Sequence, residues 1–529
     1  MRYIPLLAVA VATITLLAVA ALGGVTLRWP LALLIPLLAL GVWDILQPSH
    51  TLRRLYPLIA HFRWFFEWLR PYMRAYLLDS DTEGRPFSHV QRALIYRRSK
   101  DIEGVHAFGT DLDVYAPRHE WINHSIAPQP THHPGYRVLV GADSCAHPYS
   151  ASILNISALS FGSLSGRAIE ALNYGAAAGG FYHDTGEGGI SSHHLSHGGD
   201  LVWEIGTGYF GCRTADGRFD PEEFARRAAI EQVKMIEVKL SQGAKPGQGG
   251  LLPGPKVSPE IAETRGVPVW RDVHSPPQHS AFSTPREMLL WLAELRRLSG
   301  GKPVGFKLCI GHRWEFLAIV KAMLATDITP DFIVIDGAEG GTGAAPAELS
   351  DHVGTPLREA LVFVVNALTG TNLRDRIRLG VAGKIFDGHT MAANLALGAD
   401  WCNSARAFMF ALGCVQTKKC HTDECPTGVA TQNRWREAGL VVADKGPRVE
   451  AFHRNTVAAL ADYVAAAGLR DPSELRPEHL RVRASENEVK SADAIYDYIE
   501  PGALLGGPRP AHYDRWWRMA DPDSFLPQA

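Results

Sequence analysis

Three cysteines, Cys414, Cys420 and Cys425, follow the spacing C-x5-C-x4-C in the stretch GCVQTKKCHTDECPTGVATQ (413–432). The chain has only seven cysteines in 529 residues, so three within twelve positions is a concentration that requires a reason. Thiolates bind zinc or iron–sulfur clusters, and pairs of cysteines form disulfides. The stretch therefore predicts a disulfide, a metal site or an electron carrier.

The remaining cysteines help to separate these interpretations. A disulfide framework is disfavoured, because seven is an odd number and the other four cysteines are scattered, which fits a reducing compartment. These four are Cys145, Cys212, Cys309 and Cys402. Zinc is an alternative, because the adjacent His421 would complete a Cys3His site. The spacing alone leaves a metal ion and an iron–sulfur cluster open.

Short β-rich runs alternate with helical segments over residues 150–410. The runs are 153–161, 181–185, 201–206, 235–240, 304–310, 331–336, 377–383 and 399–405. Asp220-Pro221 and Thr284-Pro285 each place an N-cap residue before a proline, which predicts two helix starts, and a further helix is expected over 385–397. Eight such units predict an α/β fold, a (β/α)8 TIM barrel. An open doubly wound sheet is the alternative that strand counting leaves open.

Glycine clusters follow five of the expected strands. They are SFGSLSG (160–166), TGEGG (185–189), GAKPGQGG (243–250), DGAEGGTG (336–343) and VAGKIFDG (381–388). In a barrel these positions are the carboxyl ends of the strands, where barrel enzymes bind substrates and phosphates. Glycine lets backbone N–H groups approach an anionic ligand closely. One cluster could be an ordinary tight turn, but five in the same topological place predict a ligand site.

Two classes of ligand domain are not indicated. Pro346 stands where the third glycine of a G-x-G-x-x-G turn would lie in DGAEGGTGAAP, and no acidic residue marks a ribose site in a βαβ frame. The sequence therefore predicts neither an NAD(P)H domain nor a P-loop. The 53 basic and 55 acidic residues give a net charge of −2, so charge does not indicate nucleic acid as a partner.

The amino-terminal segment is expected to be a membrane anchor. Residues 3–27 contain no charged side chain and are long enough to cross a bilayer, and a second, shorter apolar run covers 29–43. Arginines then alternate with aromatic residues over 53–74. This pattern suits the cytoplasmic face of a membrane and predicts a transmembrane helical hairpin with the catalytic domain in the cytoplasm. A cleaved signal peptide and a buried apolar helical pair are the alternatives.

The motifs SFGSLSG, TGEGG, KLSQGAKPGQGGLLPGPKV, DGAEGGTGA and GCVQTKKCHTDECPTGVATQ occur in one order along the chain. In this order they resemble the FMN-binding (synthase) domain of glutamate synthase, in its stand-alone form, over residues 90–480. The resemblance implies FMN at the carboxyl end of a (β/α)8 barrel beside a [3Fe-4S] cluster. It also implies an oxidoreductase that makes glutamate from 2-oxoglutarate and ammonia through 2-iminoglutarate.

The resemblance assigns the cofactors to named residues. It implies that Cys414, Cys420 and Cys425 hold the [3Fe-4S] cluster, for which three thiolates are sufficient. Lys307 is expected near the N1/O2 edge of the flavin or near its phosphate. The implied FMN-binding residues are Ser157, Ala158, Leu159, Ser160, Lys239, Lys307, Gly340, Gly341, Gly383, Lys384, Ser404, Ala405 and Arg406.

The implied substrate is a dicarboxylate with a 2-oxo group, which requires cations that bind its carboxylates. Lys245 and Arg265 are expected in this role, with Glu187 handling a proton or orienting the imine and Gln242 beside them. Four positions depart from the pattern of the full-length enzymes. They are Glu204, Tyr209, Gln248 and Leu251.

The expected organisation has four parts. They are a membrane anchor (1–50), a juxtamembrane extension (51–149), the FMN-binding barrel (150–480) with its iron–sulfur loop (413–432), and a tail without an assigned role (481–529). Electrons are expected from an external donor, which is a ferredoxin, an NAD(P)H reductase subunit or a quinone-linked protein. Ammonia is expected free or from a glutaminase partner subunit. A membrane-tethered electron-transfer or redox-sensing module, and a barrel that binds flavin without turnover, are the alternative functions.

Overall fold

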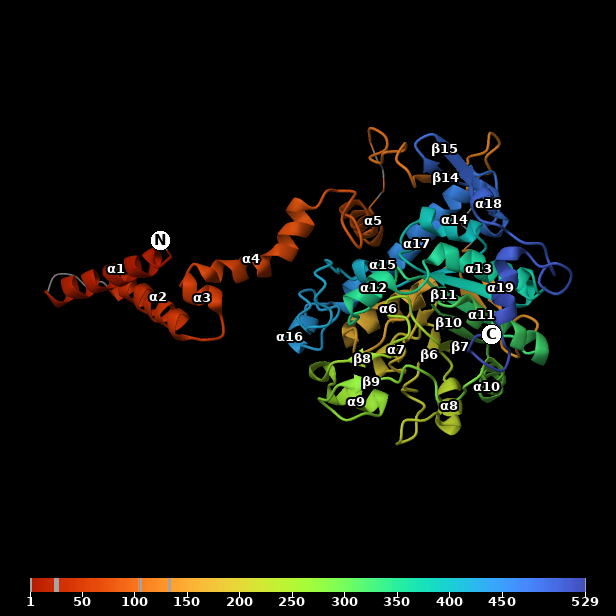
Figure 1. The fold of residues 1–529 in the computed structure, drawn as a ribbon, viewed down its shortest axis with the longest axis horizontal. Coiled ribbons are helices and arrows are strands. Elements are labelled where there is room, and N and C mark those ends of the chain that lie inside the picture. Colours follow the sequence, from red (N-terminus) through yellow and green to blue (C-terminus); the bar gives the residue numbers. More distant parts are fainter. Residues whose placement is uncertain (1, 23–27, 103, 105–106, 132–134, 529) are drawn as a thin grey trace. The chain divides into compact units, whose positions relative to one another are not determined.

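The computed structural model describes residues 2–22, 28–102, 104, 107–131 and 135–528. The chain divides into two compact units, Met1–His89 and Val90–Ala529 (Figure 1). Each unit has its own packing, so each is described separately.

The first unit is helical. Its elements are α1 (Ile4–Ala21), α2 (Arg28–Leu46), α3 (Thr51–Leu55), α4 (Ala60–Met73) and the π-helical turn η1 (Arg74–Leu78). Helices α1 and α2 are long and apolar enough to cross a membrane, and only 11% of each apolar window is buried. They are therefore not the buried core helices of a globular domain. Residues 23–27 of the first expected span lie outside the described residues.

Helix α4 has two different faces. His61 lies 2.9 Å from the buried carboxylate of Asp44, and the Arg53 guanidinium lies 4.5 Å from the centre of the Trp64 ring, so this face packs on α2 and α3. Four other aromatic side chains of α4 are exposed. They are Phe62, Phe65, Phe66 and Trp68.

The second unit is built around eight parallel strands that close into a barrel, which confirms the TIM barrel and excludes the open sheet. The strand order is β10-β11-β12-β13-β4-β5-β6-β7. The bounds are β4 (Leu154–Ile156), β5 (His183–Asp184), β6 (Leu201–Ile205), β7 (Val233–Lys239), β10 (Val304–Leu308), β11 (Phe332–Asp336), β12 (Arg378–Ala382) and β13 (Trp401–Ser404). Each expected run overlaps one of these strands.

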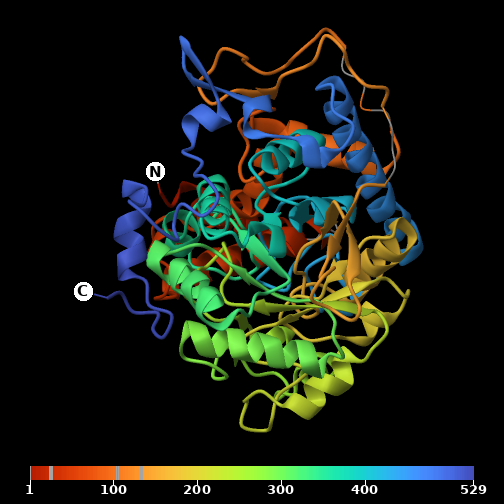
Figure 2. The ribbon, with the colours of Figure 1, turned by 90° about the vertical axis from the view of Figure 1, so that its right-hand side faces the viewer.

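Helices surround the strands, as the ribbon shows from two directions (Figures 1 and 2). The larger ones are α6 (Gly166–Gly179), α8 (Pro221–Ala228), α10 (Pro285–Leu298), α11 (Arg313–Thr326), α13 (Leu357–Thr369), α14 (Gly388–Ala396), α15 (Arg406–Ala411) and α17 (Val442–Ala466). Asp220 and Thr284 cap α8 and α10, as their sequences predict. Helix α14 begins three residues later than expected, because Asp387 is its N-cap and accepts hydrogen bonds from Thr390.

Shorter elements complete the second unit. They are α5 (His89–Ser99), β1 (Glu120–Ile122), β2 (Arg137–Val140), β3 (Tyr149–Ser152), α7 (Ser192–Leu195), β8 (Leu251–Leu252), η2 (Gly254–Lys256), α9 (Pro259–Arg265), β9 (Val273–His274), α12 (Ala347–His352), η3 (Arg374–Arg376), α16 (Arg434–Glu437), η4 (Pro472–Glu474), η5 (Pro477–His479), β14 (Leu480–Ser485), β15 (Glu488–Ser491), α18 (Ala492–Ile495) and α19 (Ala511–Met519). Strands β14 and β15 form a small sheet with β1.

One end of the barrel is closed by apolar packing. The β2–β3 hairpin contributes Val140, Tyr149 and Ala151 to a buried cluster with Phe332 and Trp401, which begin two of the barrel strands. The amino-terminal end of the barrel is thus filled with side chains, so ligand chemistry is left to the carboxyl-terminal end.

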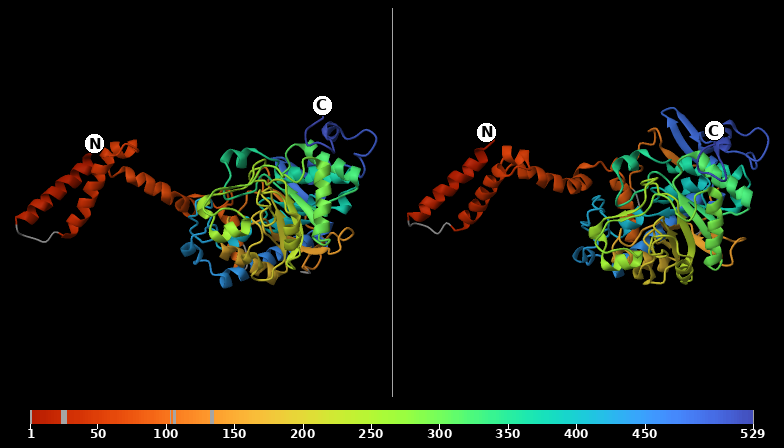
Figure 3. Two further views of the ribbon diagram at one scale, coloured as in Figure 1. Left: turned by 90° about the horizontal axis from the view of Figure 1, so that it is seen from below. Right: turned by 60° about the horizontal axis from the view of Figure 1, so that its bottom comes forward.

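The carboxyl-terminal segment packs on the outside of the barrel (Figure 3). Lys321 of α11 donates to the Ala520 carbonyl at 2.7 Å, and its ammonium lies 5.1 Å from the centre of the Trp517 ring in α19. Arg286 of α10 is paired with Asp523 at 2.6 Å. These contacts give the segment a structural role that its sequence did not indicate.

Candidate active site

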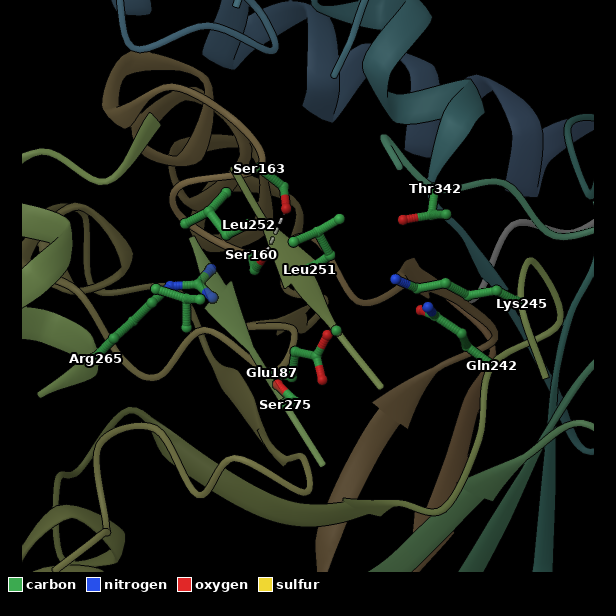
Figure 4. A pocket seen from close by; sticks show the side chains of 12 residues that line it. Ser160, Ser163, Glu187, Gln242, Lys245, Leu251, Leu252, Arg265, Ser275 and Thr342 are labelled. Carbon is green, nitrogen blue, oxygen red and sulfur yellow. Dashed lines mark hydrogen bonds between the residues drawn. The ribbon is translucent and has the colours of Figure 1, made fainter. Parts of the chain in front are cut away.

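A cleft with an empty volume of about 360 Å³, partly open to solvent, lies among the loops that follow the barrel strands. Its lining is Ser160, Ser163, Glu187, Gln242, Lys245, Gly250, Leu251, Leu252, Arg265, Val273, Ser275 and Thr342 (Figure 4). The four residues expected to act on the substrate, Glu187, Gln242, Lys245 and Arg265, are all brought together here.

Arg265 enters from one side of the cleft. It is the last residue of α9, which Ser258 caps and which ends at Gly266 with φ +64°. Its Nη2 donates to the Phe161 carbonyl at 2.9 Å, and its guanidinium lies 5.1 Å from the centre of the Phe210 ring. Burial lowers the pKa of Arg265 to about 10, although the nearby Glu187 opposes this shift. Arg265 is thus a fixed, buried cation with donors left for a ligand.

Lys245 and Gln242 enter from the opposite side, so the ammonium of Lys245 and the guanidinium of Arg265 face each other across the cleft (Figure 4). Burial lowers the pKa of Lys245, and Glu187 opposes the shift. Their loop is held by a hydrogen bond from the Gly243 N–H to Asp336 at 2.8 Å. Two cations on opposite walls suit a ligand with an anionic group at each end.

Glu187 lies between the two cations. Lys239, at the end of β7, reaches its carboxylate at 3.1 Å. Burial disfavours ionisation of Glu187, but the charges of Lys239, Arg265 and Lys245 outweigh it and hold the pKa of this carboxyl below its usual value. A Cβ on Gly250 would lie 2.5 Å from the Glu187 carboxylate, so a larger residue at this position would displace the Glu187 side chain.

The barrel interior holds a second charged group. Lys307 on β10 is paired with Glu204, lies 3.0 Å from Glu237 and lies 4.0 Å from Asp184. Ligand oxygens of the three acidic side chains lie within 4.8 Å of one another, and all four residues are buried. Burial is the largest cause that raises the pKa of Asp184, to about 7, with Lys307 opposing it. Lys307 therefore lies among carboxylates and not among the residues that line the cleft, and its role at the flavin stays a prediction.

The three cysteines lie in one loop after α15, and none of the seven described cysteines forms a disulfide. Burial raises the pKa of the Cys414 thiol to about 12, and the neighbouring thiols of Cys420 and Cys425 add to this shift. Three thiols in one loop, with no disulfide among them, are the number of donors that a cluster held by three thiolates requires.

The cysteine loop is tightly constrained. Gln416, Lys418 and Asp423 have φ between +56° and +62°, a conformation that non-glycine residues rarely adopt. Such strain persists only where the surroundings hold it. Here the Thr431 hydroxyl donates to the Asp423 carbonyl at 2.7 Å, and the Gln432 N–H donates to its carboxylate at 2.6 Å. The segment after the cysteines therefore keeps the loop in shape.

Comparison with known proteins identifies the family. Residues 140–470 match the family described as "Conserved region in glutamate synthase". The glutamate synthase large subunit-like protein YerD of Bacillus subtilis is 35% identical over 492 residues, which are 85% of this chain and 93% of that protein. The chain belongs to the FMN-binding glutamate synthase family. It is accordingly an oxidoreductase.

Other members of the family share only part of their length with this chain. The archaeal glutamate synthase (NADPH) of Archaeoglobus fulgidus is 36% identical over 278 residues, which are 52% of this chain and 51% of that protein. Among solved structures, a mutant flavocytochrome b2 with pyruvate bound aligns with a TM-score of 0.40 and 13% identity over 85% of this chain and 92% of that chain. A mandelate oxidase with (S)-2-phenylpropionate aligns with the same score and 15% identity, over 76% and 98%. The barrel is established by the strand order and needs no support from these alignments.

The residues that the glutamate synthase resemblance assigns to the FMN phosphate lie near one another. Ser404 ends β13, and its hydroxyl donates to the Ile385 carbonyl at 2.6 Å, beside Gly383-Lys384 after β12. Arg406 donates to the Glu339 carbonyl at 2.6 Å, and a Cβ on Gly341 would lie 3.2 Å from Arg406. This cradle of two cations and small residues at three neighbouring strand ends fits a phosphate dianion.

The first barrel strand leads directly into the same region. The Ser157 N–H donates to the Ser404 carbonyl at 3.0 Å, and the Leu159 N–H donates to the Asp184 carbonyl at 3.3 Å. Ser160 lines the cleft. The segment Ser157-Ala158-Leu159-Ser160 thus connects the phosphate cradle with the substrate cleft, which is the path expected for a flavin ring. Its contact with the ring remains a prediction.

Several lining and interior residues were not found from the sequence. They are Ser163, Leu252, Val273, Ser275 and Thr342 in the cleft and Asp184, Glu237 and Asp336 in the interior. The β8–β9 hairpin that carries Leu252 and Val273 has strands of two residues, which are too short for a periodic pattern. Asp336 did carry a signal, because it is a carboxylate in the otherwise apolar strand β11.

Proposed function

We propose that the chain catalyses the reductive amination of 2-oxoglutarate to glutamate with FMN and a [3Fe-4S] cluster. One observation supports this substrate above others. Lys239, Lys245 and Arg265 are three cations around the single carboxylate of Glu187, so the cleft has a surplus of two positive charges. A dianion balances this surplus, and the cations on opposite walls match a carboxylate at each end of a short chain.

The reaction balances as a two-electron reduction. Ammonia replaces the 2-oxo oxygen, which leaves as water, and the resulting C=N bond takes up two electrons and two protons to give the amino acid. When bound, FMN supplies the electron pair as hydride. The substrate and ammonia must therefore be held close together in a site with little water.

The residues of the chain have separate tasks in this reaction. Arg265 binds one carboxylate through its free guanidinium donors, and Lys245 binds the other from the opposite wall. Glu187, held ionised by Lys239, accepts a hydrogen bond from the nitrogen of ammonia or of the imine and so orients it. Gln242 donates its amide N–H groups to a substrate oxygen.

The cofactors are assigned to the residues that fit them. Gly340, Gly341, Gly383, Lys384, Ser404, Ala405 and Arg406 would hold the phosphate of FMN, and Ser157, Ala158, Leu159 and Ser160 would contact its ring. Lys307 would lie near the N1/O2 edge of the flavin or near its phosphate, and Lys239 would be a further residue beside the cofactor. Cys414, Cys420 and Cys425, whose loop follows α15, would hold the cluster, and the cluster would supply electron transfer from an external donor.

The location of the enzyme follows from its first unit. We place α1 and α2 in the membrane and the barrel in the cytoplasm. The exposed aromatic face of α4, flanked by arginines, suits the headgroup region of the bilayer. The electron donor is a ferredoxin, a reductase subunit or a quinone-linked protein, and ammonia comes free or from a glutaminase subunit.

Rapid-mixing kinetics test the function. The full chain, purified without oxygen in detergent and reduced with dithionite, is mixed with 2-oxoglutarate and ammonium, and flavin oxidation is followed by absorbance. Fast oxidation that requires both reactants, with glutamate as product, is expected. If neither reactant oxidised the flavin, an electron-transfer module would be the better assignment. If another 2-oxo acid oxidised the flavin faster, that acid would be the substrate instead of 2-oxoglutarate.

A further inference from the structure

Lys256 is a buried charge that lies outside both the cleft and the cysteine loop but contacts both. Its side chain is on η2, between β8 and α9, and only 3% of the residue is exposed. Its Nζ donates to the carbonyls of Ser163 at 3.0 Å, Cys420 at 3.2 Å and Ala430 at 3.4 Å. These acceptors come from two segments that are far apart in the sequence, Ser163 from one and Cys420 and Ala430 from the other.

The three acceptors define the charge of this side chain. An ammonium has three N–H donors, whereas a neutral amine has two, so three carbonyl acceptors select the charged form. Burial lowers the pKa of Lys256, and the neighbouring Asp423, Cys420 and Cys425 oppose this shift. Lys256 therefore carries a positive charge, shielded from water, next to two of the three cysteines.

The position of Lys256 also connects the two functional regions. Ser163 lines the cleft, and the segment that carries Lys256 runs from Leu252 to Arg265, which line the cleft as well. Cys420 and Ala430 belong to the cysteine loop. One ammonium thus holds the wall of the substrate cleft against the loop that would bind the cluster.

We propose that Lys256 is the positioning residue of the iron–sulfur site, which ties the cysteine loop to the substrate cleft and raises the reduction potential of the cluster. The inference rests on the proposed cluster. A buried positive charge stabilises the reduced, more negative form of a cluster, and outer residues of this kind tune its potential. Burial makes the effect large, because water screens the charge little.

The test is a redox titration of the full chain, followed by the EPR signal of the oxidised cluster. Lys256→Met keeps the length of the side chain and removes its charge. The midpoint potential is expected to fall by about 59 mV or more, which is a tenfold change in the ratio of reduced to oxidised cluster. Lys418→Met is the matched control, because Lys418 lies in the same loop but is exposed, and its variant should keep the wild-type potential.

Each outcome has a defined meaning. A loaded Lys256→Met protein with an unchanged potential would overturn the inference, whereas wild-type protein without iron and sulfide would overturn the proposed cluster itself. If Lys256→Met folds with a wild-type melting temperature but does not bind the cluster, the Lys256→Arg variant, which keeps the positive charge, is measured instead. A loaded Arg variant with a near wild-type potential supports the role of the charge, and an unloaded one contradicts it.

Discussion

The cleft and the barrel interior are two charged regions of one barrel. Positive charges outnumber negative ones in the cleft, and acidic side chains outnumber basic ones in the interior. The cleft has three cations around Glu187, and the interior has Lys307 among Asp184, Glu204 and Glu237. The cleft opens to solvent, so an anion can enter and balance it. The interior is closed, so only protons can balance it, and the pKa of Asp184 is raised to about 7.

This difference explains why neighbouring acids behave in opposite ways. Asp184 and Glu187 are three residues apart, yet the pKa of the first is raised and the pKa of the second is lowered. Burial raises both values, but only Glu187 has enough cations around it to reverse the effect. Lys239 contributes most to holding Glu187 ionised, and the other two cations, Arg265 and Lys245, are the ones proposed to bind the substrate.

The largest effect is expected from the interior cation. Lys307→Met leaves its buried carboxylates without a counter-charge and should lower the free energy of unfolding by about 3–5 kcal/mol. The carboxyl pKa values rise further above their unfolded values, so the loss grows as pH rises from 5 to 8. Chemical denaturation at several pH values measures this.

A double variant controls for this prediction. Lys307→Met with Glu204→Gln replaces the closest pair by two neutral side chains and should recover part of the lost stability. Equal stability of the single and double variants at all pH values would show that the pairing of Lys307 with its carboxylates does not stabilise the fold.

The next largest effect is expected in the cleft. Arg265→Gln removes a buried cation that binds a substrate carboxylate, so kcat/KM for 2-oxoglutarate should fall about 100-fold or more. Arg213→Gln is the matched control, because Arg213 also lies over Phe210, with 5.5 Å from the guanidinium to the ring centre, and does not line the cleft. Similar losses in both variants would mean that packing on Phe210, and not substrate binding, is affected.

The two acids should give opposite pH dependences. A carboxyl with a raised pKa loses stability as pH rises through its folded value, so Asp184→Asn should gain stability relative to wild type between pH 4 and 7, by at most about 1.4 kcal/mol per pH unit. A carboxyl with a lowered pKa gains its stabilising effect as pH rises towards its unfolded value, so Glu187→Gln should lose relative stability as pH rises to about 4.5, which extends the range of the measurement down to about pH 3. Melting temperatures of the three proteins across this range measure both slopes, and slopes of the same sign would contradict the comparison.

The eight barrel strands and the closed architecture could be predicted from the sequence, because buried parallel strands are short apolar runs that alternate with capped helices. The four cleft residues came from the resemblance of long motifs and not from spacing alone. The partners of Lys307 and Lys256 could not be predicted, because they are set by how distant segments pack. The β8–β9 hairpin was missed because two-residue strands have no periodic pattern.

The smallest effect is expected when a methyl group is added at Gly250. Gly250→Ala places a Cβ 2.5 Å from the Glu187 carboxylate and 3.0 Å from the Ser275 hydroxyl, so Glu187 must move. The rate of amination should fall about tenfold, or ~1.4 kcal/mol, with little change in stability. Gly311→Ala is the control, because a Cβ there meets nothing within 4 Å. A wild-type rate for Gly250→Ala would show that the position of Glu187 does not matter for the reaction.

Equilibrium binding tests the central claim most directly, namely that the surplus positive charge of the cleft selects a dianion. Calorimetry of the full chain compares 2-oxoglutarate with 2-oxopentanoate, which has the same carbon chain but lacks the second carboxylate. We predict that 2-oxoglutarate binds at least 100-fold more tightly and that Arg265→Gln removes most of this preference. Equal affinity for the two acids would contradict the assignment of the cleft to a dicarboxylate.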